Sequence, residues 1–340
     1  VDKGADHIRC NVLVGGPLSS RKGMNLPDTK LSVPPITEKD WQCVDWAIEH
    51  GLDYLSLSFV QRPEDIASLK AYLEEKESPI KVIAKIEKPL AVENIEAIVQ
   101  ISDGIMVARG DLGVEMDLAQ VPLVQKKITA LCRRFAKPVI VATQVLQSMI
   151  ENASPTRAEA TDIHTAVTES ADAVMLSGES AVGAYPVQAV KTLGHICKTT
   201  EQFIEDLDEP RQRMDLTGDL RQAEAVARSV AHMLDEVEAA FVVVWAWHDV
   251  MVRLLSKARI DVPILSLCAD EKMARQFSLS YGVISICHEP VSSYDQWIEV
   301  VEKIILDNNW ASSGQKLLLM PPRSILSENT EGALILHTIA

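Results

Sequence analysis

The sequence predicts an α/β protein in which parallel strands alternate with helices in two successive domains. From Thr37 onward the apolar residues change regularly between the spacing of helices and that of strands. The strands are apolar on both faces, as they are where helices cover each side of a parallel sheet. A polar segment, residues 206–221, contains a proline and a glycine and separates two such blocks. The 340 residues, 47% of them hydrophobic, suffice for two globular cores.

Five successive strand and helix units make up the first block. Residues 37–51 predict a helix, because a threonine precedes the first apolar repeat and a glycine follows the last one. The other helices are expected at residues 62–76, 91–102, 118–136, 156–171 and 186–205, and the strands at 52–60, 80–87, 103–110, 138–145 and 172–180. Such units have right-handed crossovers and form either an open doubly wound sheet or most of a barrel.

The alternation resumes after residue 221 and predicts a second α/β domain of ordinary size. Its helices are expected at residues 223–237, 249–259, 271–282 and 294–308, and its strands at 239–246, 262–269, 283–289, 316–321 and 333–339.

The composition excludes several classes of protein. A formal net charge of −15, without a basic stripe, disfavours binding to nucleic acid or to an anionic membrane. The sequence has no long apolar span and no signal-peptide pattern. Its six cysteines form no CxxC pair, which argues against a disulfide or zinc framework. We therefore expect a soluble, cytoplasmic protein that binds neither nucleic acid nor a membrane.

Polar side chains follow four consecutive strands of the first block. The alternation of side chains puts Lys85 and Glu87 on one face of their strand, pointing the same way as Ile83. Ala84 and Ile86 then face the helices. The next three strands deliver Asp111, then Thr143 and Gln144, then Ser177 and Glu179. Carboxyl ends of parallel strands are where α/β proteins place their chemistry, and in a barrel these side chains would converge on one mouth.

The residue types at these strand ends suit a metal and an anionic substrate. Glu87 and Asp111 are two hard oxygen ligands, too few to hold Mg²⁺ or Mn²⁺ unless substrate and water complete the shell. Lys85 adds a positive charge suited to a phosphoryl group or an enolate. Gly110 and Gly113 allow the backbone to approach a ligand closely. Each signal alone is weak, because a lysine beside a glutamate is usually a salt bridge and Gly-Asp is usually a turn.

Six stretches together resemble one family. In chain order they are KGMNLP (22–27), AKIEKP (84–89), DGIMVARGDLGVE (103–115), KPVIVATQVLQSMI (137–150), SPTRAEATD (154–162) and ADAVMLSGESAVGAYP (171–186). The combination resembles the pyruvate kinases, although no single stretch is specific. The resemblance covers roughly residues 22–205, with a weaker match in the second block.

The resemblance implies a fold and a division into domains. The fold would be a (β/α)₈ TIM-barrel-type domain, of which this chain holds the last five βα units, followed by a C-terminal α/β domain with a mostly parallel sheet. Residues 1–20 would be the tail of an inserted lid domain, 21–205 the catalytic barrel domain, 206–221 a linker, and 222–340 the C-terminal domain.

The resemblance also implies a reaction, phosphoryl transfer from phosphoenolpyruvate to ADP with formation of pyruvate and ATP in glycolysis. Lys85 matches the lysine on the transferring group, and Glu87 and Asp111 match the carboxylates on Mg²⁺ or Mn²⁺. Gly110 and Asp111 match the amides that bind the substrate carboxylate. Thr143 matches a threonine near the reacting carbon, and Ser177 with Glu179 a polar pair linked to proton delivery.

Two departures from the family pattern lead to further expectations. The first three barrel strands are not in this sequence, and with them the K⁺ ligands and most nucleotide contacts. Five strands cannot close an eight-stranded barrel, so this chain alone is expected to be poorly stable or inactive. In the second block Trp247, His248 and Asp249 replace the small residues that would cradle an effector phosphate, which predicts that sugar-phosphate activation is absent.

Two alternatives stay open. One is a metal-dependent aldolase or lyase on a related barrel, which can carry a glutamate and an aspartate at successive strand ends. The other is a catalytically inactive, pyruvate kinase-like binding module. A homo-tetramer is expected by family analogy alone.

Overall fold

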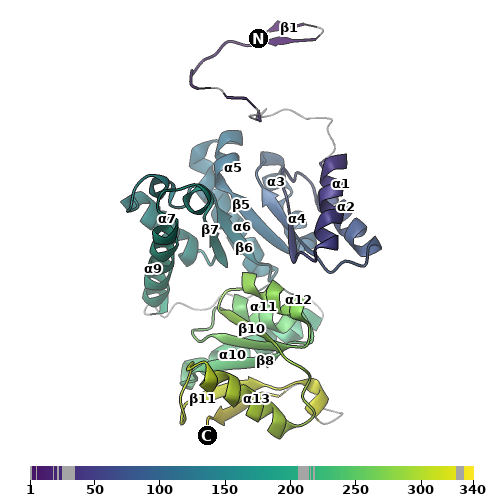
Figure 1. The fold of residues 1–340 in the computed structure, drawn as a ribbon, viewed down its shortest axis with the longest axis vertical. Coiled ribbons are helices and arrows are strands. Elements are labelled where there is room, and N and C mark those ends of the chain that lie inside the picture. Colours follow the sequence, from purple (N-terminus) through teal and green to yellow (C-terminus); the bar gives the residue numbers. More distant parts are fainter. Residues whose placement is uncertain are drawn as a thin grey trace.

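The computed structural model of the protein describes residues 2–4, 6–17, 19, 20, 23, 24, 35–205, 214, 216, 219–326 and 333–340. Two α/β domains follow one another along its long axis (Figure 1). A short antiparallel pair, β1 (Asp2–Lys3) and β2 (Ile8–Arg9), lies near the N-terminus. Most of the predicted linker, 206–221, and most of the KGMNLP motif lie outside the described residues.

The first domain contains a five-stranded, wholly parallel sheet whose strands lie in chain order. The strands are β3 (Tyr54–Leu57), β4 (Lys81–Ile86), β5 (Gly104–Ala108), β6 (Val139–Ala142) and β7 (Ala173–Met175). The helices are α1 (Glu38–Glu49), α2 (Pro63–Glu75), α3 (Pro89–Glu93), α4 (Ile95–Ile101), α5 (Arg109–Glu115), α6 (Val121–Arg134), α7 (Arg157–Thr168), α8 (Gly178–Ala181) and α9 (Pro186–Glu205). Sequential order is the strand order of a βα barrel, and β3 and β7 are the two edges of this part of it.

Three predicted elements of the first domain differ clearly from those observed, and in the second domain the helix expected at 271–282 ends at Gln276 and is followed by a 3-10 turn. The helix expected at 91–102 is two helices, α3 and α4, that meet at Asn94. The strand expected at 103–110 ends at Ala108, because Arg109 already begins α5. The strand expected at 172–180 ends at Met175, and α8 begins at Gly178. In the last two cases, periodicity alone did not mark the point where an apolar strand turns into a short helix.

The two faces of the sheet have different neighbours, as the alternation along the strand predicted. Ala84 and Ile86 belong to the apolar layer between the sheet and the helices. Ile83 packs on the opposite, inner face with Met106 and Ile140. Lys85 has the same parity as Ile83, so it too lies on the inner face.

The second domain has a mostly parallel sheet of order β10-β9-β8-β11-β12, in which only β12 runs antiparallel to its neighbour. Its strands are β8 (Phe241–Trp245), β9 (Ile264–Cys268), β10 (Val283–Cys287), β11 (Lys316–Met320) and β12 (Ile335–Thr338). The helices are α10 (Asp219–Glu236), α11 (Asp249–Lys257), α12 (Glu271–Gln276) and α13 (Tyr294–Asp307). Both faces of this sheet bear apolar clusters, which is the expected mostly parallel α/β domain.

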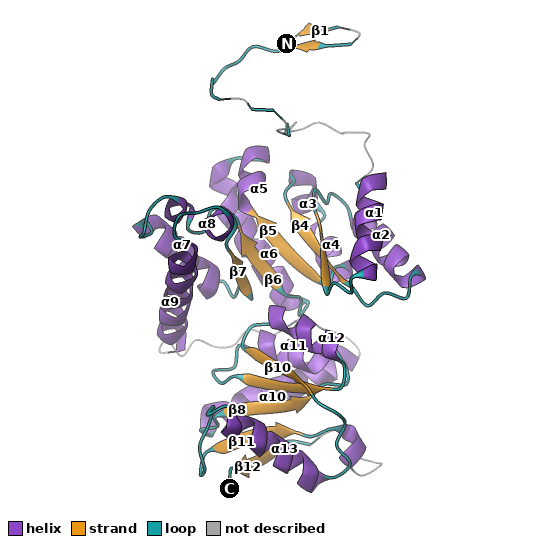
Figure 2. Cartoon of the chain, viewed as in Figure 1, coloured by secondary structure: helices purple, strands orange, loops and turns teal. Residues whose placement is uncertain are grey.

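The second domain contacts the amino ends of the barrel strands. Tyr54, at the start of β3, donates its hydroxyl hydrogen to the carbonyl of Gln276 at 2.7 Å. Lys81, at the start of β4, pairs with Asp249 at 2.9 Å. The carboxyl ends of the same strands therefore lie at the opposite end of the sheet, away from the second domain (Figure 2).

Candidate active site

Lys85 and Glu87 form an ion pair at the end of β4. The Lys85 Nζ lies 2.6 Å from Oε1 of Glu87, which is 1% exposed, and donates to Ser58 Oγ at 2.9 Å. The backbone N–H of Phe59 donates to Glu87 Oε2 at 2.7 Å. The residues after β3 thus hold both partners, so that a buried carboxylate and a partly exposed ammonium are presented together.

Sequence reasoning missed Ser58. The signal was present, because Ser58 is polar and directly follows the β3 strand, as the other predicted site residues follow theirs. Phe59 next to it has φ of +54°, a left-handed conformation that is uncommon for a non-glycine residue. This bend aims the Phe59 amide at Glu87.

Gly110 and Thr143 join the ends of β5 and β6. The Gly110 N–H donates to Thr143 Oγ1 at 2.7 Å, and that hydroxyl donates in turn to the carbonyl of Ala142 at 2.6 Å. A Cβ on residue 110 would lie 3.3 Å from Thr143 Oγ1, so glycine permits the close approach. Thr143 and Gln144 both have positive φ, +67° and +54°. The strand end is therefore a strained turn, of the kind that clusters at functional sites.

Arg109 stabilises this turn through hydrogen bonds to its carbonyls. Its guanidinium is buried, pairs with Asp162 of α7 at 2.6 Å, and donates from Nη2 to the carbonyl of Thr143 at 2.9 Å and of Gln144 at 3.3 Å. The sequence showed a charged residue at the end of a fully apolar strand but assigned it no role. The structure shows that Arg109 holds Thr143 in position from the neighbouring strand.

Asp111, which follows strand β5, is a carboxylate without a protein partner among the described residues. It lies in the first turn of α5 and is partly exposed. Within the described ranges, no side chain or backbone group donates a hydrogen bond to it or pairs with it, in contrast to Glu87 and Glu115. A partly exposed, unpaired carboxylate fits a hard divalent cation.

Glu179 and Ser177 occupy different environments. Glu179 is 1% exposed and accepts the backbone N–H of Leu146 at 3.0 Å and that of Ser177 at 2.8 Å. It therefore ties the segment after β6 to the segment after β7. Ser177 itself is exposed. Of the two, the hydroxyl of Ser177 is the group a ligand can reach, whereas the carboxylate of Glu179 acts on its surroundings through two amides.

The predicted metal ligands do not form a complete cage. In the part of the chain that the structure describes, no three residues among His, Cys, Asp and Glu come together in a group that could hold a metal ion. The prediction for Glu87 and Asp111 is thus a partial oxygen set whose remaining ligands would come from substrate and water, and both oxygens of Glu87 are engaged by Lys85 and the Phe59 N–H in this structure. The same ranges contain no helix long and apolar enough to cross a bilayer.

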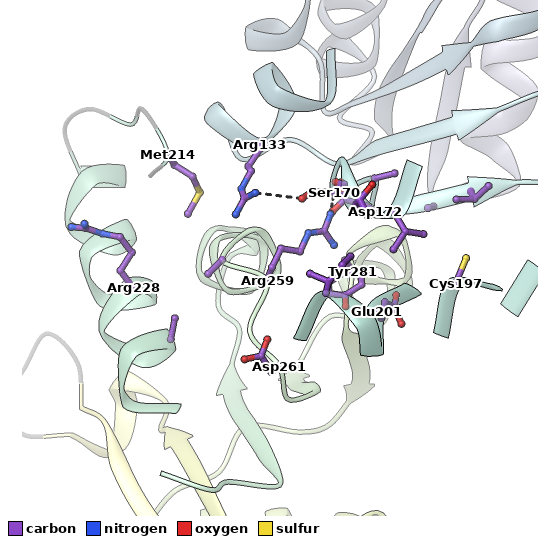
Figure 3. Close-up of a pocket in the computed structure, with 18 of the residues that line it drawn as sticks. Arg133, Ser170, Asp172, Cys197, Glu201, Met214, Arg228, Arg259, Asp261 and Tyr281 are labelled. Carbon is purple, nitrogen blue, oxygen red and sulfur yellow. Dashed lines mark hydrogen bonds and ion pairs between the residues drawn. The ribbon is translucent and has the colours of Figure 1, made fainter. Parts of the chain in front are cut away.

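A cavity of about 790 Å³ lies between the two domains, at the amino end of β7 (Figure 3). Arg133 donates to Ser170 Oγ at 3.4 Å, and Arg259 lies over the ring of Tyr281, 4.0 Å from its centroid. None of the predicted site residues lines this cavity. Arg259 of the second domain also pairs with Asp172 of the first at 3.1 Å, so the cavity lies at the contact between the domains, and the candidate site is at the other end of the sheet.

Comparisons with known proteins agree on one family. The family model described as "Pyruvate kinase, barrel domain" matches residues 1–190, and the one described as "Pyruvate kinase, alpha/beta domain" matches residues 224–328. A pyruvate kinase of Methylorubrum extorquens is 40% identical over 312 residues, which are 91% of this chain and 64% of that protein. One of Mycobacterium intracellulare is 38% identical over 95% of this chain and 68% of its own length.

A solved structure gives the same result. The crystal structure of a pyruvate kinase from Cryptosporidium parvum superposes with a TM-score of 0.82 and 30% identity, and covers 93% of this chain and 64% of that one. A pyruvate kinase of Geobacillus stearothermophilus matches all of this chain, at 37% identity, with only 58% of its own length. This chain spans less than two thirds of the length of most of these relatives. By both family models and these relatives, the chain belongs to the pyruvate kinase family.

Proposed function

We propose that this chain carries the metal and substrate-carboxylate half of a pyruvate kinase active site, for phosphoryl transfer from phosphoenolpyruvate to ADP. The observation that carries the proposal is that the carboxyl ends of the strands bear two charged side chains with protein partners and one carboxylate without a partner among the described residues. Lys85 and Glu87 are fixed by Ser58 and Phe59, whereas Asp111 has no protein partner within the described ranges. Such an edge binds a cation and an anion side by side.

The proposed roles follow from the contacts. Glu87 and Asp111 would hold a Mg²⁺ or Mn²⁺, which when bound would supply positive charge to the oxygens of the substrate. Lys85 neutralises charge on the transferring phosphoryl group and on the enolate that remains. The exposed hydroxyl of Ser177 can pass a proton. Glu179 holds Ser177 in place because its carboxylate accepts the backbone N–H of Ser177.

The substrate carboxylate would bind at the amides of Gly110 and Asp111. In the structure the Gly110 N–H is bonded to Thr143 Oγ1. Binding therefore requires the Gly110 N–H to leave Thr143 Oγ1, and the Thr143 hydroxyl can offer its own hydrogen to the ligand only by leaving the carbonyl of Ala142. The exchange makes Thr143 the group that responds to an occupied site.

Several further properties are inferred from the family and from surface features. We assign residues 21–205 to the catalytic barrel domain, 1–20 to the end of a lid, 206–221 to a linker and 222–340 to the C-terminal domain. The protein is cytoplasmic and forms a homo-tetramer, and K⁺ ligands come from outside this chain. Three valines at α8 and α9, Val182, Val187 and Val190, are 56–80% exposed and offer an apolar surface for assembly.

Exchange of the methyl protons of pyruvate with deuterated solvent tests the proposal, followed by NMR with Mg²⁺ and phosphate present. Enolisation requires the metal, Lys85 and a proton donor, but needs little from a nucleotide site. The chain is compared with its Lys85→Met and Asp111→Asn variants. Lys126→Met, a change at an exposed position of α6, is the matched control.

The proposal expects exchange by the chain and by the control, and a loss of at least about 100-fold in both site variants. Exchange that survives Asp111→Asn would contradict it. A chain that is folded by circular dichroism but exchanges no protons would favour the inactive binding module. Cleavage of a hydroxy acid to pyruvate in a retro-aldol assay would favour the aldolase or lyase.

A further inference from the structure

Two cysteines of the second domain stand directly opposite one another at the carboxyl ends of neighbouring strands. Cys268 is the last residue of β9 and Cys287 the last residue of β10, and they are register partners in this parallel pair. The backbone N–H of His288 donates to the carbonyl of Cys268 at 2.9 Å, so the pairing extends past the two cysteines. Opposite residues in a parallel pair point to the same face of the sheet.

The packing on each side of the sheet confirms this direction. Cys268 lies in the same apolar cluster as Ile264, four residues earlier on β9, and Val283 of β10 packs against that cluster. Cys287 has the same parity on its strand as Val283 and Ser285. Ile284 and Ile286 pack on the opposite face. Both thiols therefore occupy one face of the sheet, side by side.

The loop after β9 holds both sulfur atoms. The thiol of Cys287 donates to the carbonyl of Ala269 at 3.6 Å, and the thiol of Cys268 donates to that of Asp270 at 3.4 Å. Successive carbonyls of one turn thus orient the two side chains. The turn leads into α12, for which Asp270 is the N-cap.

The two thiols differ in access. Cys287 is exposed, whereas Cys268 has no exposed surface. Burial raises the pKa of Cys268, a hydrogen bond with Ser285 lowers it, and Cys287 is one of the neighbours that raise it. The buried Cys268 thus stays protonated, whereas the exposed Cys287 is the thiol that a dissolved reagent can reach.

We propose that Cys268 and Cys287 form a reversible disulfide when a low-molecular-weight disulfide, such as glutathione disulfide, reacts with the protein. Neighbouring strands lie about 4.8 Å apart, within the roughly 4.4–6.8 Å range of Cα separations in disulfides. The register therefore places the two residues at a backbone separation that a disulfide can span. The pair is a modification site separate from the active-site edge of the first domain.

The chemistry balances without any group beyond the two thiols and the oxidant. The Cys287 thiolate attacks one sulfur of the small disulfide, which breaks its S–S bond and releases one thiolate. Cys268 loses its proton as its sulfur attacks the mixed disulfide and displaces the second thiolate. The protein loses two electrons and two protons, and one molecule of glutathione disulfide becomes two molecules of glutathione.

Mass spectrometry of the whole chain tests the proposal. The protein is equilibrated with glutathione disulfide, its free thiols are alkylated, and it is digested with trypsin without reduction. Cys268 and Cys287 fall in separate peptides, residues 260–272 and 276–303, each with no other cysteine. The expected product is these two peptides joined by a disulfide, which disappears when the oxidised protein is treated with excess glutathione before alkylation.

Variants give a distinct result for each thiol. Cys287→Ser should leave Cys268 free of glutathione, because the buried thiol is out of reach, whereas Cys268→Ser should trap glutathione on Cys287. Cys43→Ser, at an exposed cysteine of α1, should leave the crosslink intact. The wild-type digest alone decides the matter if a variant fails to fold. Glutathione retained on Cys287 beside an alkylated Cys268 in that digest would overturn the proposal.

Discussion

Arg109 leaves a buried strand and places its guanidinium under the turn that carries Thr143. Two carbonyls, of Thr143 and Gln144, and the carboxylate of Asp162 share this cation. A planar guanidinium can serve several acceptors at once, whereas an ammonium is a compact point charge on a flexible stem. The position of Thr143 therefore depends on the shape of the Arg109 side chain as well as on its charge.

Arg109→Lys should loosen the Thr143 turn. The lost bonds to the carbonyls of Thr143 and Gln144 are expected to lower the free energy of unfolding by about 1–3 kcal/mol. Pyruvate proton exchange should fall by roughly tenfold or more, because Thr143 is no longer held. Chemical denaturation and the NMR exchange assay measure the two effects. Arg157→Lys, at an exposed position of α7, is the control and should change neither; an unchanged exchange rate in Arg109→Lys would disprove the role.

Lys137 provides a test of pH dependence. Burial lowers the pKa of Lys137 to about 8, and its ammonium donates to the carbonyl of Ser102 at 2.6 Å. The positive charges of Arg253 and Lys70 lower the pKa further, while Asp103 and Asp249 oppose them. The unfolded pKa is about 10.4, so between these values the unfolded chain binds more protons than the folded one. Stability should therefore rise with pH across this window.

The measurement is urea unfolding at several pH values between about 7 and 11, on the chain and on Lys137→Met. The variant lacks the Lys137 titration, so the difference in stability between the two proteins should grow as pH rises through the window. A difference that stays constant with pH would show that Lys137 titrates alike in both states. Lys126→Met, at an exposed position, should give a constant difference.

The start of helix α7 is stabilised by a capping box. Thr156 accepts the Glu159 N–H at 3.2 Å, and Glu159 accepts the Thr156 N–H at 2.7 Å. Glu159 also accepts from Ser148, so the same carboxylate holds the segment after β6. One helix start thereby supports the turn beside Thr143 and Gln144.

Thr156→Ala should cost about 1 kcal/mol of stability, since a cap is lost. Thr161→Ala on the same helix is the matched control. Thr161 is exposed, and within the described residues its hydroxyl donates to the carbonyl of Arg157 alone, so alanine there is expected to be neutral or slightly stabilising. Thermal unfolding of both variants distinguishes the cap from a general effect of removing threonine, and equal midpoints would refute the assignment.

At the scale of the whole molecule, one buried carboxylate joins the domains. Asp172, at the amino end of β7, pairs with Lys257 at the end of α11 and with Arg259 at 3.1 Å. Asp172 and Lys257 have side chains only 1% and 2% exposed. A buried cation left without its partner is costly, so this contact sets how the two domains sit against each other.

Asp172→Asn should lower stability by about 3–5 kcal/mol, because Lys257 and Arg259 lose their counter-charge in a buried place. Urea unfolding followed by tryptophan fluorescence reports on both domains, since Trp41 and Trp46 lie in the first and the other four tryptophans in the second. Glu96→Gln breaks an exposed pair with Arg134 and should change stability by less than about 1 kcal/mol. An equal effect of both changes would contradict the assigned importance of Asp172.

The sequence by itself determined the two α/β blocks, the helix that begins after Thr37, and the strand ends that bear Lys85, Asp111 and Ser177. Those features are local, because periodicity and caps depend on residues a few positions apart. Only the tertiary structure decided which groups bind one another. Lys85 donates to Ser58, Arg109 donates to the carbonyl of Thr143, and Glu179 accepts two backbone N–H groups. These partners lie on different strands, and hydrogen bonds between strands follow from register and packing, which no local pattern of residues contains.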